Sequence, residues 1–216
     1  MAKKTSRSFK LVLASGSPRR AELLKQLGLD FTILLPEIDE TPLRGEGPRQ
    51  LVRRLSREKA LSLEARARSE YSHPIILISA DTIVVAPDGK TILGKPTSAQ
   101  HAKKMLRMLS GKIHTVYTGY TIRVLQELNQ SDQLTRVIQS KVKILDLSAD
   151  LIESYLKTGE PFDKAGSYGA QGVGASFIER IHGSYTNVVG LPISQLSVDL
   201  EALTGMKRLQ WKMRLR

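Results

Sequence analysis

The sequence predicts an α/β protein with a mixed β-sheet flanked by helices, arranged in two lobes around a central cleft. Strand-like apolar runs alternate with helical patterns along its 216 residues, and two long β runs follow one another in the second half. No internal repeat or low-complexity linker divides the chain. Residues 11–205 should therefore form a single domain between two short basic ends, 1–10 and 206–216.

The first half of the chain is expected to supply three strands, a short return strand and two helices. Residues 11–14 and 31–35 are short apolar runs that suit strands, while 75–89 is a longer run that ends in a Pro-Asp-Gly turn and returns through 91–93. A first helix should begin near Ser17, with Pro18 at its first position, and end at Gly28. Pro48 should open a long helix that continues to about residue 68.

The second half is expected to supply two long strands and three helices. The strands, 114–125 and 135–147, are joined by a polar turn at 129–132. Helices should begin at Ser98 and Ser148, the first of them ending at Gly111, and a last helix should cover 194–203. Apolar residues at helical spacing predict the buried faces of the first two: Ala102, Met105, Leu106 and Leu109, then Leu151, Ile152, Tyr155 and Leu156.

Composition excludes several classes of protein. The chain has no cysteine, so it cannot use disulfides, thiolate metal sites or a cysteine nucleophile. Its apolar runs fall far short of the roughly 20 residues of a membrane span, and the N-terminus lacks the apolar region of a signal peptide. A cytoplasmic protein that does not enter a membrane is expected.

The net charge of +12 is concentrated at the two ends. Residues 1–10 and 206–216 together carry nine lysines and arginines and no acid, which leaves a body of about +3. Such ends are usually solvated, and aromatic residues are not interleaved with the basic ones as a base-stacking platform requires. Specific nucleic-acid binding is not expected, although loose binding of a polyanion by the ends is an alternative.

Two arginines occupy an unfavourable place at the start of the first helix. Arg19 and Arg20 fall in its first turn, where the helix dipole is positive and each cation costs roughly 0.3–1 kcal/mol. The small residues of the preceding loop leave the backbone N–H groups of this helix start open to an anion. The arrangement favours a phosphate-bearing ligand.

Asp81 stands in the middle of the apolar run SADTIVV, where packing gives no reason for a carboxylate. Because an unpaired buried carboxylate is costly, it should have either a partner or a task. The structural interpretation is that it pairs with an arginine or accepts hydrogen bonds from a loop. The functional interpretation is a general base at the edge of the sheet.

Three further features are ambiguous when each is taken alone. Lys95 follows the return strand and could reach the same edge, or could be a solvated loop residue. The acidic group of Glu37, Asp39 and Glu40 could hold a divalent cation or form a solvated turn. The glycines of DKAGSYGAQGVGAS could let the backbone approach a ligand, or simply form a tight loop. Combined with Asp81 and the two arginines, they indicate a nucleoside-triphosphate site.

The sequence resembles the Maf family of nucleotide pyrophosphatases in order and over nearly its whole length, from Leu11 to Leu203. The stretches that carry the resemblance are ASGSPRRAELL, PEIDETP, REKAL, SADTIVV, LGKP, LRMLSG, GEPFDKAGSYGAQG and GSYTNVVGLP. The resemblance implies an elongated mixed sheet with a central cleft, similar to the inosine-triphosphate pyrophosphatase fold. It also implies hydrolysis of a nucleoside triphosphate between the α and β phosphates, assisted by Mg²⁺ or Mn²⁺.

The resemblance assigns roles to individual residues. Asp81 is implied to activate water, and Glu40, with Glu37 or Asp39, to hold the metal. Residues implied to bind substrate are Ser15, Ser17, Arg19, Arg20, Lys59 and Lys95.

One branch of the family acts on dTTP and UTP and another on 7-methyl-GTP. The pyrimidine branch carries Arg, Thr and Gln where this chain has Arg19, Thr82 and Gln171, whereas the other branch tends to carry Trp, Gln and Glu. The amide of Gln171 supplies a donor and an acceptor that match the O4 and N3–H edge of uracil or thymine. The stretches PEIDETP and GPRQLV look closer to the methylguanosine branch, but they lie outside the three positions. Hydrolysis of dTTP and UTP is therefore predicted, with CTP and modified pyrimidines as further candidates.

Two alternatives of other kinds are compatible with the sequence. A 7-methyl-GTP pyrophosphatase would share the same machinery, and a nucleotide-binding regulator of septum formation would bind without turnover. The oligomeric state is not determined by the sequence, and a homodimer is one alternative.

Overall fold

The structure is a computed structural model that describes residues 9–72, 74–128 and 130–207. Its centre is a mixed seven-stranded sheet in the order β2-β1-β3-β5-β6-β7, with β4 paired to β3. β1 lies parallel to β2 and β3, whereas the other pairs are antiparallel. The strands are β1 (Lys10–Ala14), β2 (Thr32–Leu34), β3 (Ile75–Val85), β4 (Ile92–Leu93), β5 (Ile113–Leu125), β6 (Ser131–Ile144) and β7 (Ile178–His182).

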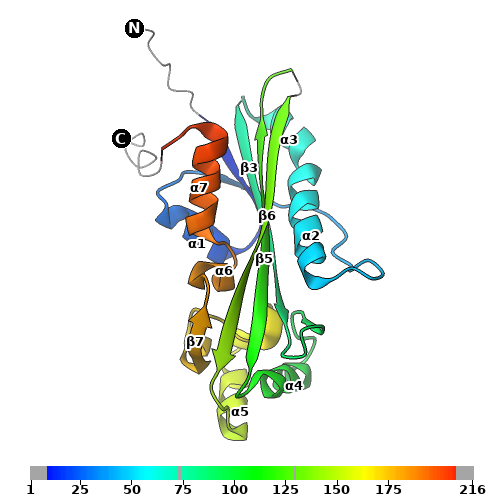
Figure 1. Cartoon of the computed structure of the whole chain (residues 1–216), viewed down its shortest axis with the longest axis vertical. Helices are drawn as coiled ribbons and strands as arrows, with labels where there is room; N and C mark the ends of the chain where they lie inside the picture. The colour runs from blue at the N-terminus through cyan, green and yellow to red at the C-terminus, as the bar shows by residue number, and fades with distance from the viewer. Residues whose placement is uncertain (1–8, 73, 129, 208–216) are drawn as a thin grey trace.

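Helices cover both faces of this elongated sheet (Figure 1). On one side lie α2 (Pro48–Ser62) and α3 (Glu64–Glu70), and on the other lie α1 (Pro18–Gln26), α6 (Tyr185–Val189) and α7 (Ile193–Thr204). The far end of the sheet is covered by α4 (Ala99–Leu109) and α5 (Ala149–Lys157), with the short 3₁₀ segments η1 (Glu160–Asp163), η2 (Ala165–Ser167) and η3 (Val173–Phe177) nearby. The mixed α/β fold expected from the sequence is confirmed.

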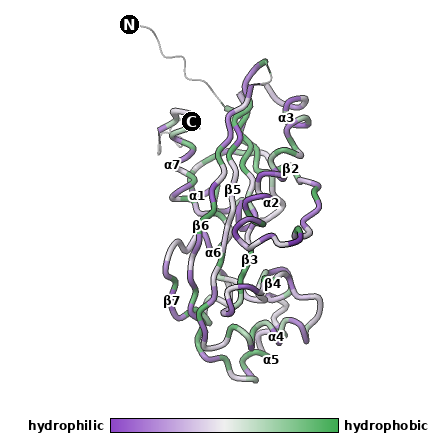
Figure 2. The backbone as a smooth tube through the Cα atoms, turned by 45° about the vertical axis from the view of Figure 1, so that its right-hand side comes forward, coloured by the Kyte–Doolittle hydropathy of each residue, from purple (hydrophilic) through white to green (hydrophobic). Residues whose placement is uncertain are grey.

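The central strand β3 is buried on both faces because helices cover each of them. Its apolar side chains alternate between two clusters: Ile76 and Ile78 pack toward α1 and α7, whereas Ile75 and Leu77 pack toward α3. Figure 2 shows β3 as hydrophobic along much of its length, whereas hydrophilic residues are frequent along α2.

One edge of β3 is unpaired in its middle. β1 pairs with it as far as Ser79, opposite Ala14, and the pairing with β4 starts only at Val84, opposite Leu93. Between these two neighbours lies Asp81, with Thr82 next to it. A polar side chain in this strand therefore sits at a gap in the sheet, the kind of place where open α/β sheets bind ligands.

Gly119 lets α2 approach the sheet closely at this level. It lies directly opposite Asp81 on β5, and a Cβ placed there would come within 2.2 Å of the carbonyl oxygen of Val52 on α2. Only glycine permits that approach. The helix is thereby held near enough for Lys59, two turns further on, to reach Asp81.

Three expectations from the sequence need correction. The helix from Pro48 is interrupted at Leu63, which is buried among the strands and separates α2 from α3. Leu151 is 42% exposed, so it is not part of the buried face of α5, although Ile152 and Tyr155 are buried. β7 and α6 were not predicted, because each is only five residues long and lacks a clear apolar period.

The first long strand ends at Leu125, and β6 begins at Ser131 rather than residue 135. Asn129, within the expected turn, and most of the two basic ends lie outside the described residues. The division into a central domain and two tails thus stays a prediction.

Candidate active site

A cavity of about 880 Å³ lies along the unpaired edge of β3. Its walls come from the β1–α1 loop, α2, both sides of β3, the segment after β4, and the glycine-rich loop that follows η2. Lining residues that the sequence predicted are Ser15, Ser17, Arg19, Arg20, Glu40, Lys59, Asp81, Thr82, Lys95 and Gln171. The cleft therefore gathers predicted residues that are as far apart as Ser15 and Gln171, 156 positions in the chain.

Asp81 is paired with a lysine rather than an arginine. Its side chain is 9% exposed, and Lys59 Nζ lies 2.7 Å from Oδ1. The same ammonium lies 2.8 Å from Oε1 of Glu40, whose side chain is 59% exposed. No described residue donates a hydrogen bond to Oδ2 of Asp81, which leaves this oxygen available to a water molecule.

The three acidic residues before α2 do not lie together at the cavity. Asp39 Oδ1 accepts a hydrogen bond from the backbone N–H of Thr41. The pKa of Arg66 is raised mainly by its hydrogen bond with Glu70, and the charge of Glu37 adds to this shift. Neither Glu37 nor Asp39 lines the cavity, and no group of three or more His, Asp or Glu side chains in the described chain is placed to hold a metal.

A metal site with fewer protein ligands does fit the cavity. Glu40 and Asp81 both contact one cation, the ammonium of Lys59, so their oxygens converge on a common region. Mg²⁺ is commonly bound by one or two carboxylates together with substrate phosphates. The donor chemistry of Glu40 and Asp81 suits that arrangement.

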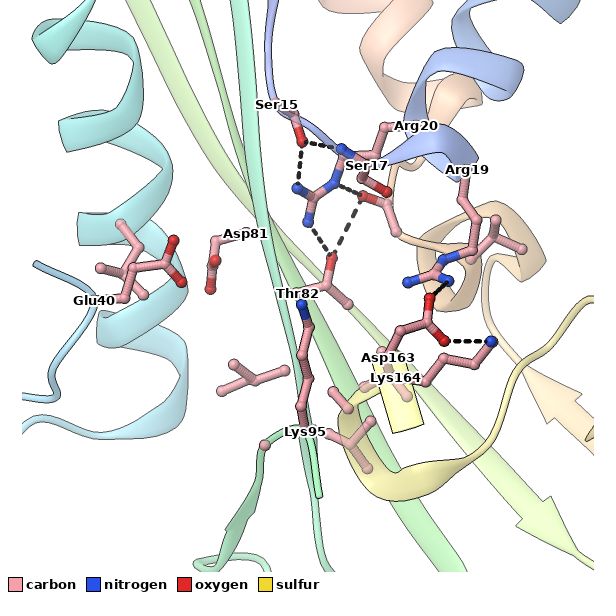
Figure 3. Close-up of a pocket in the computed structure, with 18 of the residues that line it drawn as sticks. Ser15, Ser17, Arg19, Arg20, Glu40, Asp81, Thr82, Lys95, Asp163 and Lys164 are labelled. Atoms are coloured by element: carbon pink, nitrogen blue, oxygen red, sulfur yellow. Dashed lines mark hydrogen bonds and ion pairs between the residues drawn. The ribbon is translucent and has the colours of Figure 1, made fainter. Parts of the chain in front are cut away.

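Arg20 is held on the opposite face of β3 from Asp81 (Figure 3). Its guanidinium donates to Ser15 Oγ at 2.9 Å, to Thr82 Oγ1 at 3.1 Å and to the carbonyl of Gly190 at 2.9 Å. All three acceptors are neutral. Burial lowers the pKa of Arg20 below its ordinary value, while the more distant charge of Asp81 opposes that shift. The guanidinium is thus fixed in place, but no carboxylate among the described residues is hydrogen-bonded to it.

Arg19 contacts an acid that the sequence did not single out. Its Nη1 lies 3.2 Å from Oδ2 of Asp163, across the cavity, and Oδ1 of Asp163 is 2.6 Å from Lys164 Nζ (Figure 3). Both Asp163 and Lys164 line the cavity. The neighbouring Asp-Lys pair at the start of the glycine-rich stretch was the available signal, but nothing local to it indicated a contact with the first helix.

Two lining side chains have no partner in the part of the chain that the structure describes. Lys95 is exposed at the cavity, and the side-chain amide of Gln171 makes no hydrogen bond there. Ser17 lines the cavity too: its hydroxyl does not cap α1, contrary to expectation, whereas its N–H donates to Ser15 Oγ at 3.3 Å. The start of α1 is consequently left open to an anion.

Tyr168, a lining residue that sequence reasoning missed, is held from behind by a buried histidine. Its hydroxyl lies 2.8 Å from Nε2 of His114, and the two rings meet edge to face. Nδ1 of His114 has no hydrogen-bond partner among the described residues, and burial lowers the pKa of this imidazole to about 4. His114 is therefore neutral in the folded protein at pH 7.

This histidine should make the protein less stable in mild acid. In the unfolded chain His114 would protonate near its ordinary value of about 6.5. The unfolded state then binds more protons between roughly pH 6.5 and pH 4, so the free energy of unfolding falls as the pH is lowered through that window, by up to about 3 kcal/mol. Urea unfolding at pH 7 and pH 5 measures the loss, and His114→Gln should remove most of it. An equal pH dependence in that variant would contradict this account of His114.

An α/β fold with a buried carboxylate and several cations around one cleft defines a protein suited to a small phosphate-bearing ligand. The chain belongs to the family described as Maf-like protein, whose model matches residues 10–203. Curated relatives called dTTP/UTP pyrophosphatase include one from Dictyoglomus thermophilum, 42% identical over 89% of this chain and 95% of the relative. Another, from Clostridioides difficile, is 46% identical over 86% of this chain and 91% of the relative.

Among solved structures, a HAM1 protein from Coxiella burnetii aligns with a TM-score of 0.48 and 16% identity, covering 90% of this chain and all of that one. Within the described residues, every helix is too short or too polar to cross a bilayer.

Proposed function

We propose that this protein hydrolyses dTTP and UTP to the nucleoside monophosphate and pyrophosphate, in the cytoplasm, where its substrates are available. The observation that carries the proposal is the carboxylate of Asp81, which is buried at the unpaired edge of β3 and has one oxygen free toward a cleft lined by cations. Curated relatives called dTTP/UTP pyrophosphatase at 42% and 46% identity support the choice of substrate.

Asp81 acts as the general base. Lys59 occupies Oδ1 and fixes the carboxylate, so that Oδ2 accepts a proton from a water molecule. The water oxygen forms a bond to the α phosphorus, the bond from that phosphorus to the bridging oxygen breaks, and pyrophosphate leaves with the electron pair. The products are the monophosphate and pyrophosphate, with the water proton transferred to Asp81.

The cations around the cleft neutralise the triphosphate. Arg20, fixed by Ser15, Thr82 and Gly190, keeps its positive charge in a site where no carboxylate of the described chain pairs with it. Lys95 is free to reach a phosphate oxygen, and the open N–H groups at the start of α1 add to the attraction. Developing charge on the phosphates is thereby stabilised by groups already in position.

A divalent cation would be held by Glu40 and Asp81 together with phosphate oxygens. When bound, it would supply Lewis-acid stabilisation of phosphate charge. Lys59 contacts both carboxylates and keeps their oxygens close together in its absence.

The base is recognised by the free amide of Gln171, whose donor and acceptor match the O4 and N3–H edge of uracil and thymine. Thr82 contributes to substrate binding indirectly, by holding Arg20. Its hydroxyl accepts a hydrogen bond from Arg20 and lies 2.9 Å from the hydroxyl of Thr118. A homodimer is compatible with this proposal and stays a prediction.

A panel of nucleotides tests the proposal. With Mg²⁺ or Mn²⁺, the protein should release pyrophosphate from UTP and dTTP faster than from CTP, GTP, ATP and 7-methyl-GTP. Faster hydrolysis of 7-methyl-GTP would assign the chain to the other substrate class, and nucleotide binding without pyrophosphate release would indicate a regulator. Deleting 1–8 and 208–216 should leave the activity in place.

Arg19→Ala should affect ligand binding more than the stability of the free protein. Its ion pair with Asp163 is partly exposed at Arg19, 30%, and exposed at Asp163, 63%, and such pairs contribute at most about 1 kcal/mol. A non-hydrolysable UTP analogue at a hundredfold excess over Kd should stabilise the wild-type protein by about 2.7 kcal/mol, and less in this variant. Thermal melts with and without the analogue measure both effects; an unaltered ligand shift with a much lower melting temperature would make Arg19 structural.

A further inference from the structure

The loop that carries Gln171 is anchored on both sides of that residue. On the N-terminal side, the backbone N–H of Gly169 donates to the hydroxyl of Tyr155 at 3.3 Å. The hydroxyl of Tyr185 donates to the carbonyl of Ala170 at 3.1 Å. These two tyrosines come from α5 and α6, so elements outside the loop hold the two residues just before Gln171.

On the C-terminal side, a single carboxylate holds the loop. Glu160 accepts hydrogen bonds from the N–H of Val173 at 2.8 Å and from the N–H of Gly174 at 3.0 Å. Its Oε1 also accepts the hydroxyl proton of Tyr155 at 2.9 Å, which joins the two anchors. Gly172 has a φ of +79°, and a Cβ there would lie 2.7 Å from Oε2 of Glu160, so the backbone passes directly over the carboxylate.

This anchoring contrasts with the side chain it surrounds. Gln171 lines the cavity, and its side-chain amide makes no hydrogen bond within the described chain. Backbone groups on both sides of it do make hydrogen bonds: those of Gly169, Ala170, Val173 and Gly174. The structure thus fixes the position of the backbone while leaving the amide available to a ligand.

A fixed distance is what recognition of a pyrimidine requires here. The O6 and N1–H edge of guanine presents the same acceptor and donor as the O4 and N3–H edge of uracil, so one amide cannot separate the two by pairing alone. Guanine is larger, and its edge lies further from the sugar. If the loop that carries Gln171 is rigid, the smaller base fits at hydrogen-bond distance from the amide and the larger one is excluded. If the loop can move away from the nucleotide, both bases fit.

We infer that Tyr155, Tyr185 and Glu160 are positioning residues that set base selectivity by fixing the distance of Gln171 from the nucleotide. The inference rests on the proposed function. None of the three lines the cavity, so they act through the loop rather than by touching the substrate.

The Tyr155→Phe/Tyr185→Phe double variant tests this inference. Phenylalanine retains the ring of Tyr155, which packs edge to face on Phe177 with centroids 4.7 Å apart, and removes only the hydroxyls that hold the loop. The ratio of kcat/KM for UTP to that for GTP should fall by about tenfold, mainly through a higher KM for UTP and a lower KM for GTP. The kcat for UTP should stay within about threefold of wild type because Asp81 is untouched.

Two further variants distinguish a specific effect on the position of Gln171 from a general loss of rigidity in the protein. Tyr71→Phe, a change away from the cavity, should leave the UTP-to-GTP ratio unaltered. In a Gln171→Ala background the two tyrosine changes should alter the ratio by less than half as much, on a logarithmic scale, because the side chain they position is gone.

A ratio within twofold of wild type in the double variant, or an equal effect with and without Gln171, would overturn the inference. A wild-type protein that hydrolyses neither nucleotide would overturn the proposed function itself, and the inference with it. An active wild-type protein with an unchanged ratio in the double variant would leave the proposed function standing.

Discussion

Asp81→Asn should lower kcat for UTP by about 10²–10⁴-fold, the usual contribution of a general base. The amide keeps the shape of the carboxylate and its place at the gap between β1 and β4, but it cannot accept a proton from water. Lys59 retains its contact with Glu40, so the helix should stay in position. Initial rates of pyrophosphate release at saturating UTP measure the effect.

Binding is the control for this variant. The thermal shift produced by a non-hydrolysable UTP analogue should largely persist in Asp81→Asn, since the phosphate-binding cations Arg20 and Lys95 are unchanged and Glu40 remains to hold a divalent cation. Asp150→Asn, an exposed change on α5, should retain full activity. More than half of the wild-type turnover in Asp81→Asn would remove this carboxylate from the mechanism.

Lys59→Met should destabilise the ligand-free protein by about 3 kcal/mol, at the lower end of the cost of breaking a buried ion pair. Methionine replaces much of the buried aliphatic stem, so packing is largely kept. The loss arises because Asp81, 9% exposed at its side chain, is left without its counter-charge. Urea unfolding measures the change in the free energy of unfolding.

Two comparisons make this result specific. Lys103→Met breaks the pair with Glu153, whose side chain is 47% exposed, and should cost less than about 1 kcal/mol. Adding Asp81→Asn to Lys59→Met should restore most of the lost stability, because the buried charge is then removed as well. Equal decreases in the free energy of unfolding in Lys59→Met and Lys103→Met would show that the buried Lys59–Asp81 pair contributes no more to stability than an exposed pair.

The sequence predicts this architecture well wherever an element has a strong period of its own. The apolar face of α4 and its Ser98 cap, which accepts from the N–H of His101, follow directly from local spacing. The central run 75–89 is long and apolar enough to be recognised as a strand, and β3 occupies Ile75–Val85 of it. β7 and α6 lack such a signal and are stabilised by contacts that only the folded chain creates.

In the candidate site, too, some residues could be recognised from the sequence and others could not. Asp81 stands out from the sequence because a carboxylate in an apolar strand demands an explanation, and Arg19 and Arg20 stand out because they oppose the helix dipole. Their partners do not stand out. Asp163 is 144 positions from Arg19. One acceptor of Arg20 is the backbone carbonyl of Gly190, and because every residue has a carbonyl, the residue type does not indicate this contact.

For the metal site, closeness in sequence was misleading. Closeness in sequence suggested that Glu37, Asp39 and Glu40 act together, whereas the structure turns only Glu40 of these three toward the cavity. Its convergent partner is Asp81, and both contact Lys59, which the close packing of α2 on Gly119 brings near Asp81.

Hydrolysis of UTP in ¹⁸O-labelled water, with Mg²⁺ present and the products separated, tests the central claim most directly. Attack at the α phosphorus in the cleft beside Asp81 predicts UMP and pyrophosphate in equal amounts, with the label in UMP. The Asp81→Asn protein should yield neither product at a comparable rate. UDP and phosphate as products, or label recovered in pyrophosphate, would contradict the proposed reaction.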